Sequence, residues 1–266
     1  MTKYIIIAKH LISNNVINLK YGTFYIQGVG LGSIADILTS VRYNIYDRKK
    51  YALSQLKAAL DADFEGYEEV QHYLIYETPK YGNDDDYADQ QAVSVFEIYY
   101  DAVNGRPDAR GGVHRINMLP TTSHIYFGGV TGATADGRKA FKPLSEGISP
   151  SQGADKDGPT AVIKSASKID HLRTGGTLLN QKFSPQFFED EESYNCLTAL
   201  IRSYFALDGH HIQFNVVNAS TLREAQKHPE LYRNLIVRVA GYSDYFNDLG
   251  EELQDEIISR TEHEMG

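Results

Sequence analysis

The sequence has little of the material that crosslinked or membrane proteins need. It contains one cysteine, Cys196, among 266 residues, so no disulfide can form within the chain. A chain without disulfides is typical of a reducing compartment. No apolar run reaches the roughly 18 residues of a membrane span. The N-terminal stretch "MTKYIIIAKHLISNN" is interrupted by Lys9 and His10, and no Ala-x-Ala cleavage site follows, so we expect no signal peptide. We predict a cytoplasmic protein without a membrane partner.

Positive charge is also scarce. The chain has 26 Lys and Arg against 35 Asp and Glu, which gives a formal net charge of −9. Nucleic acids are bound by cationic patches, and no basic stripe is visible, so we expect no nucleic-acid partner. Tryptophan is absent, whereas 19 tyrosines are spread along the chain, where we expect them mostly at the edges of the core. Hydrophobic residues make up 42%, enough for one or two folded domains.

The apolar spacing predicts a mixture of helices and strands without internal repeats. Residues 106–185 differ in composition from the rest of the chain. Glycine, proline and threonine are frequent there and helical periodicity is lost, which predicts long loops. Long loops in a compact chain are usually functional. The expected helices are one capped by Ser33, then 52–64, two on either side of Pro79, 186–206, one that opens at Ser220 or Thr221, and 249–264. The expected strands lie within 4–27 and at 124–129, 160–167, 210–218 and 232–243.

Two glycine-rich stretches resemble nucleotide-binding loops. "GATADGRK" (132–139) has the glycine spacing of a phosphate loop, but Arg-Lys replaces the Lys-Ser/Thr pair, so the magnesium-binding hydroxyl is missing. "GVGLGS" (28–33) has Ser33 where the dinucleotide fingerprint requires glycine or alanine. We favour tight turns and helix caps at both places and expect no bound nucleotide.

Three other stretches could carry chemistry, and each has a structural alternative. "YGNDDDYAD" (81–89) lacks calcium-loop spacing, so we expect Asn83 or Asp84 to cap a helix instead. His210 and His211 would face opposite sides of a strand, which argues against a shared metal. One should be buried and hydrogen-bonded and the other exposed. Cys196 lies in an apolar helical pattern, where we expect a buried, inert thiol.

"RVAGYSDYF" (238–246) is the most informative stretch. Gly241 stands where a predicted buried strand ends. From spacing alone it could be a bulge, a turn residue with positive φ, or a site of close backbone approach.

Together with its surroundings this stretch resembles the C-terminal radical module of the glycyl radical enzymes. "LQDEIISRT" follows it, and "PKYGNDDDYAD", "TGATADGRKAFKPLSEGISPSQGAD", "GPTAVIKSASKIDH", "GGTLLNQKFSP" and "GHHIQFNVV" are similar to earlier segments of that family. The resemblance runs from about Gly28 to Glu264. The residues of these segments are closer to the glycerol or diol dehydratase-like and choline lyase-like branch than to pyruvate formate-lyase.

The resemblance implies the second half of a ten-stranded α/β barrel with a C-terminal glycyl radical module. We expect residues 28–225 in the half-barrel and 226–266 in the radical domain, with residues 1–27 unassigned. Gly241 would carry the radical, installed by a radical S-adenosylmethionine activase, with no bound metal. Glycine suits this role because a Cα without Cβ can become planar without strain. Its flanking loop would be formed by Arg238, Val239, Ala240, Tyr242 and Ser243.

The resemblance also predicts how the site is enclosed. The apolar residues 235–237 and the aromatic Tyr242, Tyr245 and Phe246 would exclude solvent from the radical. Met118 and Pro120, just before "TTSH", are candidates for a substrate-pocket wall. A turn that packs against the barrel is the alternative for these two residues.

One part of the family pattern is missing from this sequence. Family members generate a thiyl radical on the cysteine of a Gly-Cys-Val-Glu type loop, and Cys196 is not in such a motif. We therefore expect a chain that is inactive alone and that acts with a chain carrying the other half-barrel, as part of a dehydratase or lyase for a small 1,2-substituted substrate. We expect the full-length form to be a homodimer, with a bacterial microcompartment as an alternative location. A spare part for an oxygen-cleaved enzyme, or a fragment of a formate C-acetyltransferase, are the alternatives.

Overall fold

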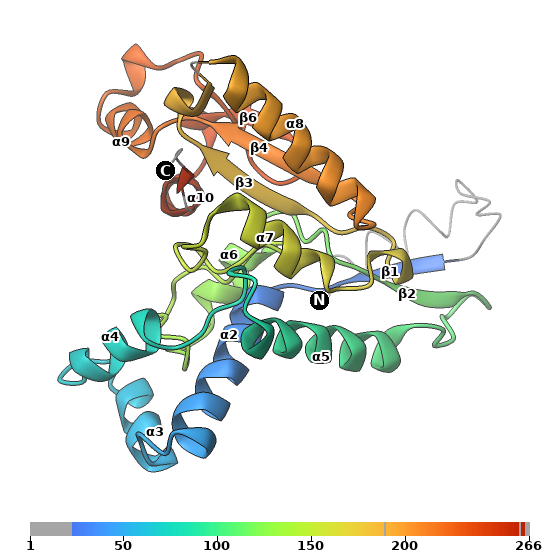
Figure 1. The fold of residues 1–266 in the computed structure, drawn as a ribbon, viewed down its shortest axis with the longest axis vertical. Helices are drawn as coiled ribbons and strands as arrows, with labels where there is room; N and C mark the ends of the chain where they lie inside the picture. The colour runs from blue at the N-terminus through green and yellow to red at the C-terminus, as the bar shows by residue number, and fades with distance from the viewer. Residues whose placement is uncertain (1–22, 189, 261, 264–266) are drawn as a thin grey trace.

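The centre of the molecule is a row of four short parallel strands (Figure 1). The computed structural model describes residues 23–188, 190–260 and 262–263. Strand β1 (Thr23–Gln27) pairs with β2 (Val113–Asn117), and β3 (Leu179–Phe183) pairs with β4 (Ile212–Val216), both in parallel. A parallel bridge between Met118 and Thr177 connects the two pairs. The two pairs follow one another in chain order and form part of an α/β barrel wall, as predicted, and β3 has a short C-terminal strand as its second neighbour.

Helices connect these strands, because parallel neighbours require a crossover. Between β1 and β2 lie α2 (Leu31–Val41), its π-helical extension (Arg42–Asp47), α3 (Leu53–Asp61), α4 (Glu68–Tyr76) and α5 (Asp86–Val103). Between β2 and β3 lie α6 (Ser123–Gly129) and α7 (Gly158–Ser167), and α8 (Glu191–Ala206) connects β3 to β4. No helix in the described part of the chain has the length and apolar character that crossing a membrane requires.

Two predicted strands are helices instead. Residues 124–129 belong to α6 and residues 160–167 to α7. A short apolar run cannot be assigned to helix or strand by periodicity alone. In α7 a proline in the first turn favours helix initiation, and Val162, Ile163 and Ala166 are buried at helical spacing.

Two predicted helix caps are also wrong. Asp85, rather than Asn83 or Asp84, caps α5 by accepting a hydrogen bond from the Tyr87 N–H (2.8 Å). Asn83 instead binds the loop at 154–157, and Asp84 pairs with Lys164 of α7 and with Lys168, which follows that helix. Helix α2 begins at Leu31, so Ser33 lies inside its first turn and exchanges hydrogen bonds with Ser145 (2.9 and 2.8 Å).

Alternation along β3 and β4 gives the sheet two different faces. On one face Leu179 and Phe183 belong to the main hydrophobic core, against which Ile212 and Phe214 pack, on the side of α7 and α8. The other face carries the polar side chains Asn180, Lys182, Gln213 and Asn215. All five residues of β3 are buried, so both faces of this strand are covered.

The C-terminal segment covers the polar face. It contains α9 (Ala219–Lys227), the antiparallel hairpin β5 (Ile236–Arg238) and β6 (Ser243–Tyr245), α10 (Glu251–Ser259) and the short β7 (Glu262–His263) beside β3. Its apolar side chains form a second core with Leu178 and Val217. Lys182 crosses from β3 to donate to the Ile258 carbonyl of α10 (3.0 Å). We call this segment, residues 219–263, the hairpin module.

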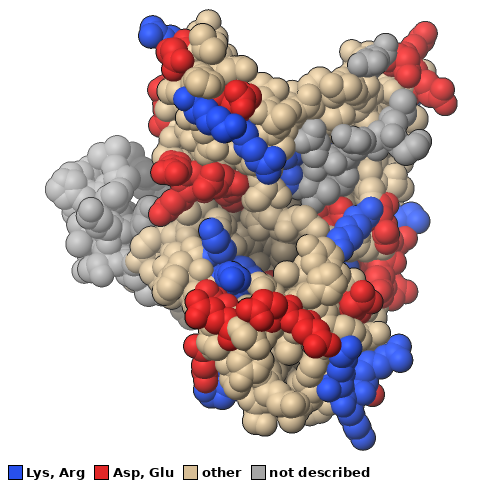
Figure 2. Space-filling view, turned by 90° about the vertical axis from the view of Figure 1, so that its left-hand side faces the viewer, with Lys and Arg blue, Asp and Glu red and all other residues tan. Residues whose placement is uncertain are grey.

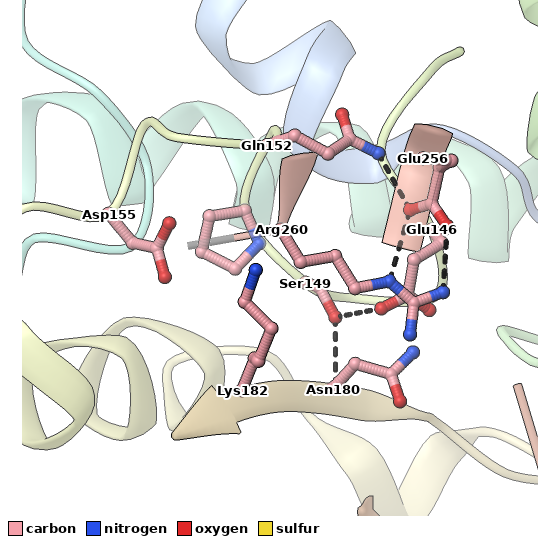
Figure 3. A pocket seen from close by; sticks show the side chains of 9 residues that line it. Glu146, Ser149, Gln152, Asp155, Asn180, Lys182, Glu256 and Arg260 are labelled. Atoms are coloured by element: carbon pink, nitrogen blue, oxygen red, sulfur yellow. Dashed lines mark hydrogen bonds and ion pairs between the residues drawn. The ribbon is translucent and has the colours of Figure 1, made fainter. Parts of the chain in front are cut away.

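A buried ionic cluster fastens α10 to the half-barrel (Figure 3). Arg260 binds Glu256 through both ends of its guanidinium group, at 3.2 and 2.8 Å. Gln152 donates to the same carboxylate (3.1 Å), and the imidazole Nε2 of His124 lies 3.5 Å from it. The cluster borders a cavity of about 20 Å³, the size of about one water molecule.

A second carboxylate lines the same cavity. Glu146 accepts a hydrogen bond from the Ser149 hydroxyl (2.6 Å), which in turn accepts from the Asn180 N–H of β3 (3.0 Å). Burial raises the pKa of Glu146, although Arg260 opposes the shift. Burial acts in the same direction on Glu256, but Arg260 and His124 outweigh it and hold the pKa of Glu256 well below its ordinary value. The pKa values of the two buried carboxyl groups are thus shifted in opposite directions.

This contrast predicts opposite pH effects on stability. Because the pKa of Glu146 is raised in the folded chain, its contribution to the free energy of unfolding is present below its ordinary pKa of 4.5. This contribution is lost as pH rises through the raised value. Glu146→Gln should therefore stabilise the chain at pH 8, by roughly 1 kcal/mol, and have little effect at pH 4. The contribution of Glu256 is present at neutral pH and is lost on acidification, and Glu256→Gln should cost about 3–5 kcal/mol at pH 7. Urea unfolding of both variants between pH 4 and pH 8 measures the change in unfolding free energy. If both substitutions changed it with the same sign at pH 8, the opposite pKa shifts of Glu146 and Glu256 would be contradicted.

A close backbone approach gives a second stability prediction. Gly147 has φ +51°, and a Cβ placed there would lie 2.2 Å from the Leu178 carbonyl oxygen. Gly147→Ala should therefore destabilise the chain by about 3 kcal/mol, from left-handed strain plus overpacking. Gly153→Ala is the matched control, because Gly153 also has positive φ but its Cβ would meet open space, so we expect about 1 kcal/mol. Equal losses of unfolding free energy would show that the close approach is absent.

Candidate functional site

The glycine singled out in the sequence lies at the tip of the β5–β6 hairpin. The Val239 N–H donates to the Tyr242 carbonyl (2.9 Å), so Ala240 and Gly241 form a two-residue turn. Gly241 has φ +82°, a conformation that favours glycine at the third position of a tight turn. Of the three interpretations, the turn with positive φ is the one observed. Close approach is not, because a Cβ on Gly241 would meet nothing within 4 Å.

Side chains from the half-barrel and the hairpin hold this turn. The amide N–H of Gly241 donates to Gln213 Oε1 (2.9 Å), which reaches across from β4. Arg238 donates to the Gly241 carbonyl through Nη2 (3.3 Å) and to the same Gln213 oxygen through Nε (3.1 Å). Gln213 also donates to the Val239 carbonyl (3.2 Å). Both peptide groups that flank the Gly241 Cα are therefore hydrogen-bonded.

A second set of hydrogen bonds fixes the strand that leads into the turn. Asn215, two residues after Gln213 on the same face of β4, accepts from the Arg238 N–H and donates to the Arg238 carbonyl, each at 2.7 Å. Arg260 donates to the carbonyls of Arg238 and Val239 at 3.3 and 3.0 Å. The ionic cluster at α10 and the amides of β4 thus meet on the backbone just before Gly241.

The predicted shielding of Gly241 is wrong for the described part of the chain. Gly241 is exposed, and so are Ile236 (57%), Tyr242 (40%) and Tyr245 (44%), whereas Val237 and Phe246 are buried. The apolar side chains that alternate inward support the hairpin from behind, and those that alternate outward face solvent. Of the other flanking residues, Val239 and Ala240 are buried, Arg238 is half-buried and Ser243 is exposed.

One histidine of this region interacts with the charge of Arg238. His211, which precedes β4, is half-buried, and burial and then the charge of Arg238 lower its pKa. His210 is exposed. Both histidines precede β4, so the expected alternation across a strand does not apply to them. The buried, hydrogen-bonded histidine of this region is His171, whose ring contacts the Thr177 hydroxyl (2.7 Å) and the Ala166 carbonyl (3.0 Å).

The remaining predicted residues lie after β2 and on α8. Met118 is buried in the main core, where its sulfur packs against Gly28, and Pro120 is buried nearby. Cys196 is exposed, which corrects the expectation of a buried thiol, because α8 buries Ser193, Leu200 and Tyr204 instead. Within residues 23–188, 190–260 and 262–263, no three His, Cys, Asp or Glu side chains gather as a metal site would require.

One face of the molecule mixes both signs of charge. On the face shown in Figure 2, lysines and arginines are interspersed with aspartates and glutamates around a hollow. A separate cavity of about 360 Å³ is lined by residues of the "TADGRKAFKP" loop, including Lys139 and Lys142, together with Ser259 of α10. The loop, the barrel helices and the hairpin module therefore border one cavity.

Three residues that hold this geometry were missed in the sequence. Gln213 and Asn215 belong to "HHIQFNVV", in which attention falls on the histidines. Their spacing of two within a strand would place both amides on one face, and that is the available signal. Arg260, four residues after Glu256 on a helix, carries a similar signal for an ion pair.

Comparisons with known proteins agree with this geometry. The family description "Glycine radical" matches residues 144–247, and "Pyruvate formate lyase-like" matches residues 15–128. The chain is 57% identical over 243 residues to trans-4-hydroxy-L-proline dehydratase from Clostridioides difficile, covering 91% of this chain and 31% of that protein. It is 44% identical to isethionate sulfite-lyase from Desulfovibrio desulfuricans, covering 91% and 29%.

Solved structures show the same relationship. The hydroxyproline dehydratase of Clostridioides difficile, with trans-4-hydroxy-L-proline bound, superposes with a TM-score of 0.90 at 56% identity, over 92% of this chain and 31% of that one. The B12-independent glycerol dehydratase of Clostridium butyricum gives a TM-score of 0.88 at 45% identity, over 92% and 31%. The chain thus spans about a third of the length of these relatives. With its partial α/β barrel and glycine-tipped hairpin, it belongs to the glycyl radical enzyme family.

Proposed function

We propose that this chain stores the radical of a glycyl radical dehydratase or lyase on Gly241. The observation that carries the proposal is the turn itself. Gly241 lies in the segment that matches the glycine radical family, at an exposed hairpin tip, with its peptide groups bound by side chains. A Cα without a side chain can become planar within such a turn, and φ +82° disfavours every residue with a Cβ.

Exposure of Gly241 suits installation of the radical. The bond to be broken is Gly241 Cα–H, and the hydrogen atom would leave with one electron to the carbon radical of a radical S-adenosylmethionine activating enzyme. Such a reagent must reach Cα directly, and open space lies where a Cβ would be. The tethers at Arg238 and Val239 would keep the backbone in register while Cα is approached.

The complete reaction needs a second half-barrel beside the one described. We propose that a partner carries this other half-barrel, with the cysteine loop that passes the radical to the substrate. Strand β1 has a paired neighbour only on its β2 side within the described residues, and an unpaired strand edge is a natural site for continuation of a sheet. The exposed apolar side chains Ile236, Tyr242 and Tyr245 would be covered by the same partner. Alone, the chain should be inactive.

The substrate class follows from the relatives. We propose radical elimination of water from a small hydroxylated substrate. The identity of 57% to trans-4-hydroxy-L-proline dehydratase makes trans-4-hydroxy-L-proline the first compound to test. Carbon–sulfur cleavage, named for isethionate sulfite-lyase, is the second chemistry to test. Met118 and Pro120 stay candidates for a pocket wall completed by the partner. We place the assembled enzyme, as a homodimer, in the cytoplasm or in a microcompartment.

Electron paramagnetic resonance after anaerobic activation tests the proposal. The chain, incubated with a radical S-adenosylmethionine activating enzyme of the family, should give a glycyl radical doublet that disappears on exposure to oxygen. Gly241→Ala should abolish the signal. Gly250→Ala is the matched control, because Gly250 is an exposed glycine of the same module with open space at its Cβ and without positive φ, and it should keep the signal. A doublet that survives Gly241→Ala would disprove the assignment.

A further inference from the structure

We propose that Gln213 and Arg238 stabilise the radical electronically, beyond holding the turn. This inference rests on the proposed function, since it concerns the same Cα. It adds a claim that the proposed function does not contain. The two side chains would lower the energy of an unpaired electron on Gly241, whereas a tether that only holds the backbone would not. Both are positioning residues, because they contact the peptide groups of Gly241 and not the substrate.

The geometry places one hydrogen bond on each side of the Gly241 Cα. On the nitrogen side, the Gly241 N–H donates to Gln213 Oε1 at 2.9 Å. On the carbonyl side, the Gly241 oxygen accepts from Arg238 Nη2 at 3.3 Å. The second bond is charge-assisted, because the guanidinium carries a permanent positive charge.

These two hydrogen bonds polarise the peptide groups in the direction that favours delocalisation. An unpaired electron on a glycine Cα is shared with an amide nitrogen that releases electrons and a carbonyl that withdraws them. An acceptor on the N–H increases the electron release of the nitrogen, and a cationic donor on the oxygen increases the electron withdrawal of the carbonyl. Both effects therefore move spin density away from Cα, and hydrogen bonds in a chain polarise one another.

The side chain of Gln213 is fixed for this task. It is 5% exposed, so its hydrogen bond to Gly241 is little weakened by water. Its oxygen accepts from both Gly241 N and Arg238 Nε, which uses the two lone pairs of an amide oxygen. Its nitrogen donates to the Val239 carbonyl at 3.2 Å, so the orientation of the amide is set. The oxygen cannot turn away from Gly241 without breaking all three bonds.

Asn215 provides a matched control on the same strand face. It binds the main chain of Arg238 through two hydrogen bonds of 2.7 Å, and among the described residues it makes no hydrogen bond to a peptide group of Gly241. It is also 5% exposed. Replacing it should loosen the hairpin to a similar extent as replacing Gln213, without changing the electronic environment of Cα.

The test compares the radical signals of four chains after anaerobic activation: wild type, Gln213→Met, Gln213→Glu and Asn215→Leu. Gln213→Met removes the acceptor and keeps the volume, so spin should return to Cα and the α-proton splitting of the doublet should widen. The half-life of the radical under anaerobic conditions should shorten about fivefold, the ratio that corresponds to one net hydrogen bond. Gln213→Glu keeps an acceptor oxygen and should keep the narrower splitting. Asn215→Leu should change the yield at most, with the wild-type line shape.

Arg238→Met tests the carbonyl side in the same way and should also widen the splitting. The inference is overturned if Gln213→Met and Arg238→Met both give the wild-type splitting and half-life, or if Asn215→Leu widens the splitting as much as they do. Gln213→Met could also lose the signal completely. That loss supports the inference if Gln213→Met unfolds as cooperatively in urea as Asn215→Leu and Asn215→Leu keeps its radical signal. If Asn215→Leu loses the signal too, a structural role explains both losses and the inference is overturned. Absence of a signal from the wild-type chain would instead refute the proposed function.

Discussion

The hydrogen bond from the Gly241 N–H to Gln213 is the interaction on which the rest of the site depends. A radical glycine must combine two conflicting properties: its Cα has to be reachable, yet its backbone has to stay in one conformation. An exposed turn makes the Cα reachable. It does not by itself keep the backbone in one conformation, because loop tips are normally the most mobile parts of a fold. Side chains from a rigid strand resolve the conflict, since Gln213 and Asn215 bind the hairpin backbone while the space beside Gly241 stays open.

The other half of the support comes from the buried ionic cluster. Arg260 is neutralised by Glu256 and donates to the carbonyls just before the turn, so a helix of the hairpin module and a strand of the half-barrel hold the same backbone segment. Buried ion pairs add little net stability when compared with apolar packing, but they are selective for one arrangement because every broken contact leaves a charge unpaired. Glu146, whose pKa is raised by burial, lies beside this cluster on the barrel side and lines the same cavity.

The sequence predicted the α/β class, most helices and the special glycine, because these depend on local apolar spacing and on long family motifs. It failed where short apolar runs fit either period: residues 124–129 and 160–167 are helical because of tertiary packing and an early proline. Cys196 and the aromatic residues around Gly241 were expected to be buried, and their exposure depends on which sides of α8 and of the hairpin are covered, which spacing alone does not reveal. Gln213 was overlooked because a buried glutamine acquires its role only from a backbone 28 residues away along the chain.

Amide hydrogen exchange at Gly241 tests the central claim most directly, since it needs neither activation nor a partner chain. If Gln213 binds the Gly241 N–H, that amide should exchange at least about tenfold more slowly than in an unstructured peptide, although the residue itself is exposed. Exchange at the unstructured rate, with the amides of β3 and β4 still protected, would show that the turn is not held and would contradict this account of the site.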